Sequence, residues 1–450
     1  MTRLLLALFF GVFWVSASDG AEAAGRRPYG GSVDVAVRDL SGLADPHVVE
    51  TRSGRLVADL VHARLFRLEE ARILGELADG PGVQSGDTLV ITLVAGARFH
   101  DGSPVESGDV VASLKRLATL GDASPIGRLV QALSVSAQGP RVVQIGMPRG
   151  ASVDEVRLLL ARPEAAILHQ GRVGAGPMRP LPGEGDRRTL VAWDGYALGR
   201  PWLQEVRLVK VAAAREEAAL RFGDVELAFE KPERPVAATA LRAGHASWLV
   251  VFHPRYRSQV AFRGFVRQAI LDARLSRYVD GKNSSAELPW PSPLAATSPP
   301  PRTAHSATGR AGLVVAYPSG EGEELARALR DALSPIAMGQ ARVAPLTGTV
   351  SPARASDPPW DLALVRLDWA SLSKSQAAHE LARALGLEPP RAELVLSRKV
   401  GDWASGVAMR HDAVAAAHVE VDAWLTTRVG GVGTDGPLPD LQRGYRARSP

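Results

Sequence analysis

The residues of this 450-residue chain that could do chemistry are few and scattered. Cysteine is absent, which excludes disulfides, a thiol nucleophile, thiolate zinc ligation and iron–sulfur ligation. Ten histidines are spread along the chain, and the closest two, His411 and His418, are seven residues apart without a nearby carboxylate pattern. Such a pair is more typical of surface or cap positions than of a metal centre. We therefore expect no metal site.

Cofactor and nucleophile motifs are also missing. Residues 431–436 fit G-x-G-x-x-G by letter, but Pro437 and Pro439 follow at once, and too little chain remains for the helix and strand of a dinucleotide-binding unit. The patterns G-x-x-x-x-G-K-[ST], H-E-x-x-H and G-x-S-x-G do not occur. The sequence predicts a protein that has no cofactor and is not an enzyme, with a secreted hydrolase as the minor alternative.

The charge balance bears on the partner. Lys and Arg number 53 and Asp and Glu 48, so the net charge is 53 − 48 = +5, and the cations are interspersed with acids along the chain. No phosphate-binding face is indicated, and nucleic acid is not an expected partner. The length, with 46% hydrophobic residues, is sufficient for two or three domains with sizeable cores.

The first segment is predicted to be a signal peptide over residues 1–23. Arg3 precedes an apolar run from Leu4 to Val15, and small and polar residues then lead to Ala23. In helical form the run would span about 18 Å, which is short of the roughly 30 Å hydrocarbon core of a bilayer. Export with cleavage after Ala23 therefore predicts a periplasmic protein, and a retained membrane anchor is the alternative.

Strand-like and helix-like patterns alternate in the remaining chain. Residues 89–94 and 313–317 are apolar runs typical of strands, and each is followed by a helical pattern. In the second of these helices, residues 323–333, leucines recur every four residues and mark one buried stripe. Ser107 is expected to cap the first helix. The alternation predicts mixed α/β lobes.

A Pro-rich segment interrupts this pattern over residues 288–302. Six prolines lie in it, so it cannot form a regular helix or a central strand. We predict a loop or semi-rigid connector inside the second half of the chain.

Six segments, in order along the chain, resemble the family 5 extracellular solute-binding proteins, the dipeptide-, oligopeptide- and nickel-binding class that serves ABC importers. The strongest is residues 93–117, in which Phe99-His100-Asp101-Gly102 is similar to the family's F-H-D-G turn between a strand and a helix. Gly174 to Pro177 resembles the G-T-G-P loop and is expected to form a turn close to a hinge. The other segments are residues 193–206, 219–228, 262–278 and 360–364.

The resemblance implies the α/β, two-lobed fold of periplasmic binding proteins, of type II and similar to cluster C, with a hinge and a cleft between the lobes. The first lobe is expected over residues 24–250 with a return over 416–450, and the second over 251–415, with the connector inside it. The implied function is that of a monomeric periplasmic receptor that binds a peptide or similar small polar solute and delivers it to an inner-membrane ABC permease and ATPase complex. A sensor or interaction protein that has lost transport is the alternative.

The resemblance also implies a ligand site just after residues 360–364. Peptide binders of this class carry there a Trp and then an Asp that holds the ligand's ammonium group. A gapless comparison places that Asp at Ala370, and Asp368 and Trp369 are close by but out of register. The sequence therefore lacks, in register, the residue that would bind a free peptide amino terminus.

Four residues are candidates for this site. On a strand, Arg366 and Asp368 share one face because they are two residues apart. They either bind the carboxylate and ammonium groups of a ligand or pair with each other. Trp360 and Trp369 either wall the pocket or belong to the core of the lobe.

Overall fold

The structure is a computed structural model that describes residues 30–430, 441 and 445–446, apart from short internal gaps. The predicted signal peptide and Ala370 lie outside the described residues, and the connector 288–302 is described in part. Within the described ranges, no helix is long and apolar enough to cross a membrane. The gaps are residues 70–71, 184, 230–231, 233, 280–282, 285–286, 292–293, 295–297, 301–311, 319–320, 336, 338–339, 347–355 and 370–372.

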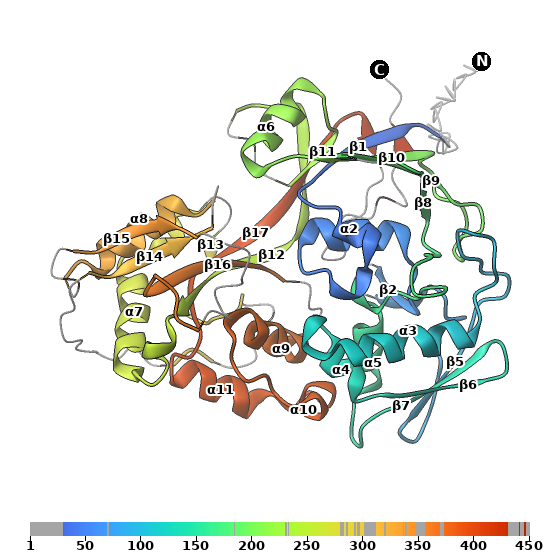
Figure 1. The fold of residues 1–450 in the computed structure, drawn as a ribbon, viewed down its shortest axis with the longest axis horizontal. Coiled ribbons are helices and arrows are strands. Elements are labelled where there is room, and N and C mark those ends of the chain that lie inside the picture. The colour runs from blue at the N-terminus through green and yellow to red at the C-terminus, as the bar shows by residue number, and fades with distance from the viewer. Residues whose placement is uncertain are drawn as a thin grey trace, which may run out of the picture.

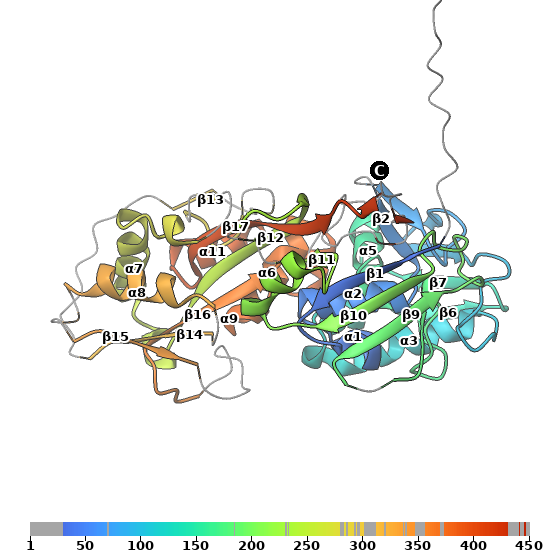
Figure 2. The same ribbon diagram turned by 90° about the horizontal axis from the view of Figure 1, so that it is seen from above.

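One large sheet runs through both lobes of the molecule (Figures 1 and 2). Its strand order is β15-β14-β16-β12-β17-β11-β1-β10-β9-β8, with β13 paired to β17. The strands are β1 (Ser32–Val37), β8 (Met178–Pro180), β9 (Arg187–Ala192), β10 (Glu205–Lys210), β11 (Leu227–Ala228), β12 (Ala238–Phe252), β13 (Asn283–Ser284), β14 (Val314–Tyr317), β15 (Arg342–Pro345), β16 (Leu362–Asp368) and β17 (Val414–Thr426).

The two longest strands, β12 and β17, connect the lobes. They pair antiparallel from Ala238 opposite Thr426 to Val250 opposite Val414. The end of β17 that carries Leu425 pairs with β11, and the second half of β12 pairs with β16. A register shift interrupts the pair at Gly244, whose φ of 127° suits glycine. Any change in the angle between the lobes must therefore pass through this two-stranded ribbon.

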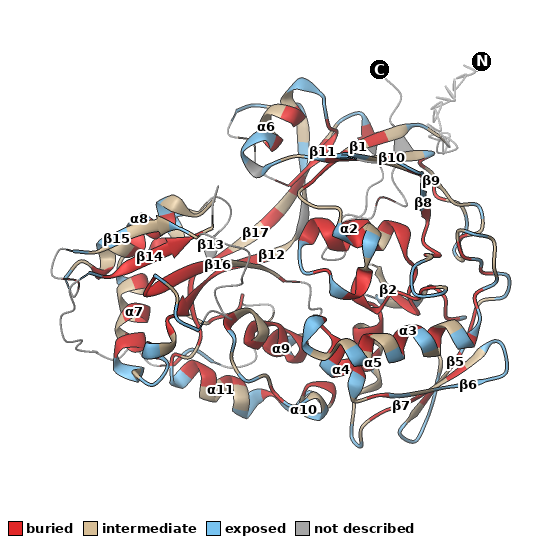
Figure 3. Cartoon of the chain, in the orientation of Figure 1, coloured by how far each residue is buried: buried red, intermediate tan, exposed pale blue. Residues whose placement is uncertain are grey.

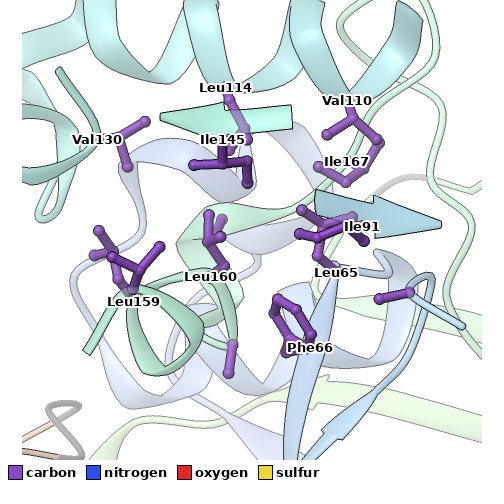
Figure 4. Close-up of a cluster of buried hydrophobic side chains, with 14 of the residues drawn as sticks. Leu65, Phe66, Ile91, Val110, Leu114, Val130, Ile145, Leu159, Leu160 and Ile167 are labelled. Atoms are coloured by element: carbon purple, nitrogen blue, oxygen red, sulfur yellow. The ribbon is translucent and has the colours of Figure 1, made fainter. Parts of the chain in front are cut away.

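The first lobe also contains a compact α/β unit packed on one core (Figure 4). Its second sheet has the order β4-β5-β7-β6, and β2 pairs with β3. The cluster includes Phe66 from β2, Ile91 from β5 and Leu114 from α3. The elements are β2 (Phe66–Glu69), β3 (Arg72–Gly75), β4 (Val83–Ser85), β5 (Thr88–Thr92), β6 (Ser134–Gln138), β7 (Val142–Gly146), α3 (Ser107–Leu120), α4 (Gly127–Gln131) and α5 (Val153–Leu160). The helices α1 (Ser41–Ala44) and α2 (Arg52–Val61) pack on a separate apolar cluster of the first lobe.

The N-cap of α3 lies one residue before Ser107, the residue that was predicted to cap this helix. The N-cap is Glu106, which forms a reciprocal capping box with Asp109, while the Ser107 hydroxyl donates to the backbone oxygen of Gly139. The predicted turn over residues 99–102 is present, and the backbone N–H of Gly102 donates to the backbone oxygen of Phe99.

Helices cover both faces of the sheet in the second lobe. On one face, α7 (Val260–Asp272) and α8 (Glu323–Leu333) pack against alternate residues of β12 and β16. On the other face lie α9 (Lys374–Leu385) and α11 (Gly401–Met409). The stripe predicted on α8 is confirmed, because Leu325, Leu329 and Leu333 are all buried.

The lobes also touch through α9 and α10 (Ala392–Leu396) (Figure 1). Figure 3 shows α9 buried along most of its length, since one side packs on the second-lobe sheet and the other faces the first lobe. Ala378 from α9 and Val395 and Leu396 from α10 belong to the core cluster of the first lobe. The two lobes are therefore joined by an apolar interface as well as by the β12–β17 ribbon.

Candidate functional site

A cavity of about 690 Å³ lies where α2 and its neighbours in the first lobe face β16 and α9 of the second. Its wall is strongly charged and carries one aromatic side chain, Phe229. The lining residues are Arg38, Glu50, Thr51, Arg52, Ser53, Arg55, Pro125, Glu216, Phe229, Glu321, Val365, Arg366, Leu367, Asp368, Glu380, Arg383 and Ala384.

The α2 helix presents two arginines to the cavity. Its N-terminus is fixed by Thr51, whose hydroxyl accepts a hydrogen bond from the backbone N–H of Gly54 at 3.0 Å. Arg52 and Arg55 are three residues apart and share the face that looks toward the second lobe. The adjoining apolar face, which includes Val57 and Val61, is buried in a separate apolar cluster. The amphipathic character of α2 therefore sets the direction of both guanidinium groups.

The β16 strand supplies the predicted charged pair. Arg366 and Asp368 both line the cavity, and Arg366 Nε lies 3.5 Å from Asp368 Oδ1. Arg366 also donates to Glu321 at 3.1 Å. Asp368 Oδ1 is 3.4 Å from Nη2 of Arg52, so this carboxylate lies between two guanidiniums. The cavity thus contains the pair, and its members interact with each other and with the first lobe.

The electrostatics of this group favour the charged form of Asp368 but disfavour that of Arg52 relative to a guanidinium in water. Burial opposes a charge on Asp368, but the guanidiniums of Arg52 and Arg366 outweigh it and hold the pKa of the carboxyl below its usual value. Burial lowers the pKa of Arg52 to about 10, in spite of the neighbouring Asp368, and the positive charges of Arg366 and Arg55 act in the same direction as burial. Asp368 therefore compensates the buried charge of Arg52 only in part.

A buried ion network continues from the cavity into the interface between the lobes. Arg55 donates to Glu164 at 2.9 Å and to the backbone oxygen of Asp368 at 3.1 Å. Glu380 of α9 lies 3.6 Å from both Arg55 and Arg162. Burial would raise the pKa of Glu164, but Arg162 and Arg55 lower it to about 2. This network holds α2 against β16 and α9.

Trp360 and Trp369 were candidates for the walls of the pocket, but they lie elsewhere in the structure. Both are buried in the apolar cluster behind the sheet, and neither lines the cavity. Trp369 follows Asp368 directly, so the alternation of a strand sends its ring to the opposite face, where its indole N–H donates to Ser247 at 2.8 Å. The Trp360 ring packs edge-on against His253. The core alternative describes their positions.

The sequence did not single out Arg38, Arg52 or Arg55. A Thr cap followed by Arg at the first and fourth helical positions was visible in the sequence. What it could not reveal is that this face opposes a strand more than 300 residues further along the chain.

Comparison with known proteins agrees with this architecture. Residues 73–262 match the family described as bacterial extracellular solute-binding proteins, family 5 Middle. No curated protein sequence matches the chain.

Several solved structures share the fold. The periplasmic binding protein DppA from Helicobacter pylori in complex with the peptide STSA has a TM-score of 0.76 at 14% identity, with 94% of this chain and 99% of that one covered. The oligopeptide-binding protein AppA from Bacillus subtilis, in complex with a nonapeptide, gives 0.69 at 14% identity over 94% and 100%. NikZ from Campylobacter jejuni in complex with Ni(L-His) gives 0.71 at 14% identity over 92% and 99%.

At these identities the solved structures establish the fold, which is the predicted two-lobed α/β fold of binding proteins. The family match covers the segments in which the sequence motifs are densest. Residues 73–262 thus match family 5 of the bacterial extracellular solute-binding proteins, and the likeness to solved structures shows the fold of such binding proteins over nearly the whole chain.

Proposed function

We propose that the chain is the solute-binding component of an ABC importer and that it binds a peptide or a similar small polar solute in the cavity between its lobes. The observation that carries the proposal is the cavity itself. Its volume of about 690 Å³ falls within the range of ligand pockets, and its wall offers charged donors and acceptors from both lobes. A solute that contacts both walls would stabilise the closed arrangement.

Binding without turnover is part of the proposal. The described residues that line the cavity include the hydroxyls of Thr51 and Ser53 but no histidine that could act as a general base toward them. The carboxylates of the cavity already interact with arginines. This supports a receptor over a hydrolase, and an open cavity of this size supports a ligand-binding role over a module that has lost its ligand.

The family match supports a proposal about where the protein acts in the cell. Its members are extracellular proteins, and we propose that this chain is exported by the signal peptide over residues 1–23, released into the periplasm and presented as a monomer to a permease and ATPase complex. We also propose the lobe limits 24–250 with 416–450, and 251–415. The limit near 250 lies at the end of β12 and the limit near 416 at the start of β17, the two strands that join the lobes.

Native mass spectrometry of the protein purified from the periplasm tests this function. We expect a co-purified small molecule that is released unchanged on denaturation, and a smaller radius of gyration by X-ray scattering when it is added back to protein that has been stripped of ligand. Conversion of the molecule by the protein would overturn the assignment as a receptor. N-terminal sequencing that finds an intact Met1 would overturn the export step.

A further inference from the structure

The charges of the cavity restrict the groups that a solute can present, given the proposed function. Among the described residues that line it, arginines and carboxylates occur in equal number. Each carboxylate already forms an ion pair: Glu50 with Arg383, Glu216 with Arg38, Glu321 with Arg38 and Arg366, Asp368 with Arg52 and Arg366, and Glu380 with Arg55 and Arg162. An incoming ammonium group would have to compete with an arginine for any of them.

Asp368 is the least suitable partner for an ammonium group. Its Oδ1 lies 3.4 Å from Arg52 Nη2 and 3.5 Å from Arg366 Nε. A cation placed in hydrogen-bond contact with this carboxylate would be only a few ångströms from two guanidiniums. In a partly desolvated cavity, that repulsion offsets the attraction of the single carboxylate.

Arg52, in contrast, favours an anionic group of the solute. Its side chain is 8% exposed, and Nη1 has no hydrogen-bond partner among the described residues, while Nη2 is the atom that approaches Asp368. The residue lines the cavity. A buried guanidinium N–H without an acceptor is costly, so a side-chain rotation that turns Nη1 from the wall toward an anionic acceptor of the solute would be strongly favoured.

The first turn of α2 adds to this preference. Thr51, Arg52 and Ser53 line the cavity, and they form the N-terminus of a ten-residue helix. Backbone N–H groups at a helix N-terminus have no acceptor in the helix backbone; here the Thr51 hydroxyl accepts from that of Gly54, and the helix dipole attracts negative charge to the turn as a whole. The nearby carboxylate of Asp39 accepts from the hydroxyl of Thr51 and is not part of the cavity wall.

We propose that Arg52 and the first turn of α2 bind a carboxylate group of the solute, and that Asp368 compensates Arg52 and Arg366 instead of binding an ammonium group. The solute class is therefore one that carries a carboxylate, with or without a free amino group. The inference rests on the proposed function for the presence of a solute, and on the geometry of Arg52 for its chemistry.

Calorimetric titration with three related probes separates the two charged ends of a peptide. Trialanine carries both, N-acetyl-trialanine keeps only the carboxylate, and trialanine amide keeps only the ammonium group. We expect the acetylated peptide to bind within about threefold of trialanine. The amide should bind roughly tenfold to a hundredfold more weakly, since it loses a charge-assisted hydrogen bond. A large loss on acetylation with none on amidation would overturn the proposal.

Variants of Arg52 test whether this residue binds the carboxylate group of the peptide. Arg52→Gln should weaken trialanine and its acetylated form by the same factor and leave the amide unaffected, and Arg52→Lys should restore part of the binding. Arg327→Gln, on the exposed side of α8, is the matched control and should change none of the three affinities. Equal loss for all three peptides in Arg52→Gln would overturn the assignment. The comparison of peptides on the unmodified protein remains decisive if Arg52→Gln does not fold.

A different result is expected if the proposed peptide-binding function is wrong. If none of the three peptides binds, a peptide ligand is rejected, and succinate and citrate then test the site as carboxylates without a peptide. Binding of either that is lost in Arg52→Gln supports the carboxylate site, and absence of binding by both overturns it.

Discussion

Asp368 determines the charge balance of the cavity. It is the shared anion of Arg52 and Arg366, which come from different lobes. Removing one member of a buried ion group leaves the remaining charges uncompensated, which costs more than the pair itself contributes.

Asp368→Asn should therefore lower the free energy of unfolding, by about 1–3 kcal/mol given that a quarter of the side chain is exposed. At the same time it should strengthen the binding of N-acetyl-trialanine, because a negative charge near the proposed carboxylate site is removed. Urea denaturation and calorimetric titration measure the two effects. Glu323→Gln, in an exposed pair on α8, is the control and should alter neither. Weaker binding of trialanine with unchanged stability would instead indicate an ammonium partner.

Trp369 and His418 belong to a chain of hydrogen bonds behind the cavity. The Trp369 indole donates to the Ser247 hydroxyl, that hydroxyl lies 2.7 Å from His418 Nδ1, and His418 Nε2 lies 2.8 Å from the backbone oxygen of Leu288. Neutral His418 with its proton on Nε2 satisfies every one of these contacts. Burial lowers the pKa of His418 to about 4, although the bond to Leu288 acts in the opposite direction.

Acid should destabilise the protein before its carboxylates titrate. Burial lowers the pKa of His62 and His379 to about 3 and that of His100 and His418 to about 4. The unfolded chain binds these protons below about pH 6.5 and the folded chain does not, so stability falls as the pH decreases from 6.5 toward 4. Each histidine contributes up to about 1.4 kcal/mol per pH unit. Urea denaturation at pH 7.5 and 5.5 should show the loss, and His418→Asn should reduce its slope; an unchanged slope would contradict the assignment.

At the scale of elements, the loop over residues 174–177 holds the end of α2 in place. The backbone N–H of Gly176 donates to the backbone oxygen of Val61 at 3.0 Å, and the Gly176 oxygen lies 3.0 Å from His100 Nε2. A Cβ at Gly176 would lie 2.6 Å from the backbone nitrogen of His62, and one at Gly174 would lie 2.2 Å from the Val61 oxygen. The glycines are required by this close approach of two backbones.

Gly176→Ala should therefore destabilise the fold by about 1–3 kcal/mol, because backbone has to move to admit the methyl group. Gly108→Ala is the matched control, since it lies in α3 with open space around its Cα and should stabilise the protein by about 0.5–1 kcal/mol. Thermal denaturation of both variants checks the contrast. Equal effects would mean that the loop is not constrained by α2.

At the scale of the whole molecule, Glu155 of α5 ties the lobes together away from the cavity. It is 2% exposed, and it accepts hydrogen bonds from Ser373 at 2.6 Å, from Arg398 at 2.8 Å and from Gln376 at 3.3 Å, all of which come from the second lobe. Opening must break these bonds and separate α10 from the apolar cluster of the first lobe. The closed state is thus stabilised by contacts that involve no solute.

Glu155→Ala should shift the molecule toward opening in the absence of ligand. Each charge-assisted hydrogen bond to a buried carboxylate contributes about 1.5–3 kcal/mol, enough to change a two-state balance by tenfold or more. X-ray scattering should report a larger radius of gyration for the variant than for the unmodified protein, and Glu323→Gln should leave it unchanged. An unaltered radius in Glu155→Ala would show that the apolar contacts alone hold the lobes closed.

The local features of this protein could be predicted from its amino-acid sequence alone. Alternation placed Arg366 and Asp368 on one face of a strand, a four-residue spacing marked the buried side of α8, and the turn at 99–102 identified the strand and helix on either side of it. These features depend on neighbours within a few residues, so their periodicity is visible in the chain. The same motifs carried the resemblance to the family, which residues 73–262 confirm.

Which parts of the molecule these features face depends on the packing of the two lobes. The period of a strand states that Trp369 and Asp368 point in opposite directions, but the order of the sheet and the position of α9 decide which side is the cavity and which is the core. The pairing of Arg52 with Asp368 joins residues 316 positions apart, 368 − 52. Such a contact arises from the packing of the two lobes and has no period in the sequence. For that physical reason the sequence indicated half of the site, on β16, and the structure supplied the other half, on α2.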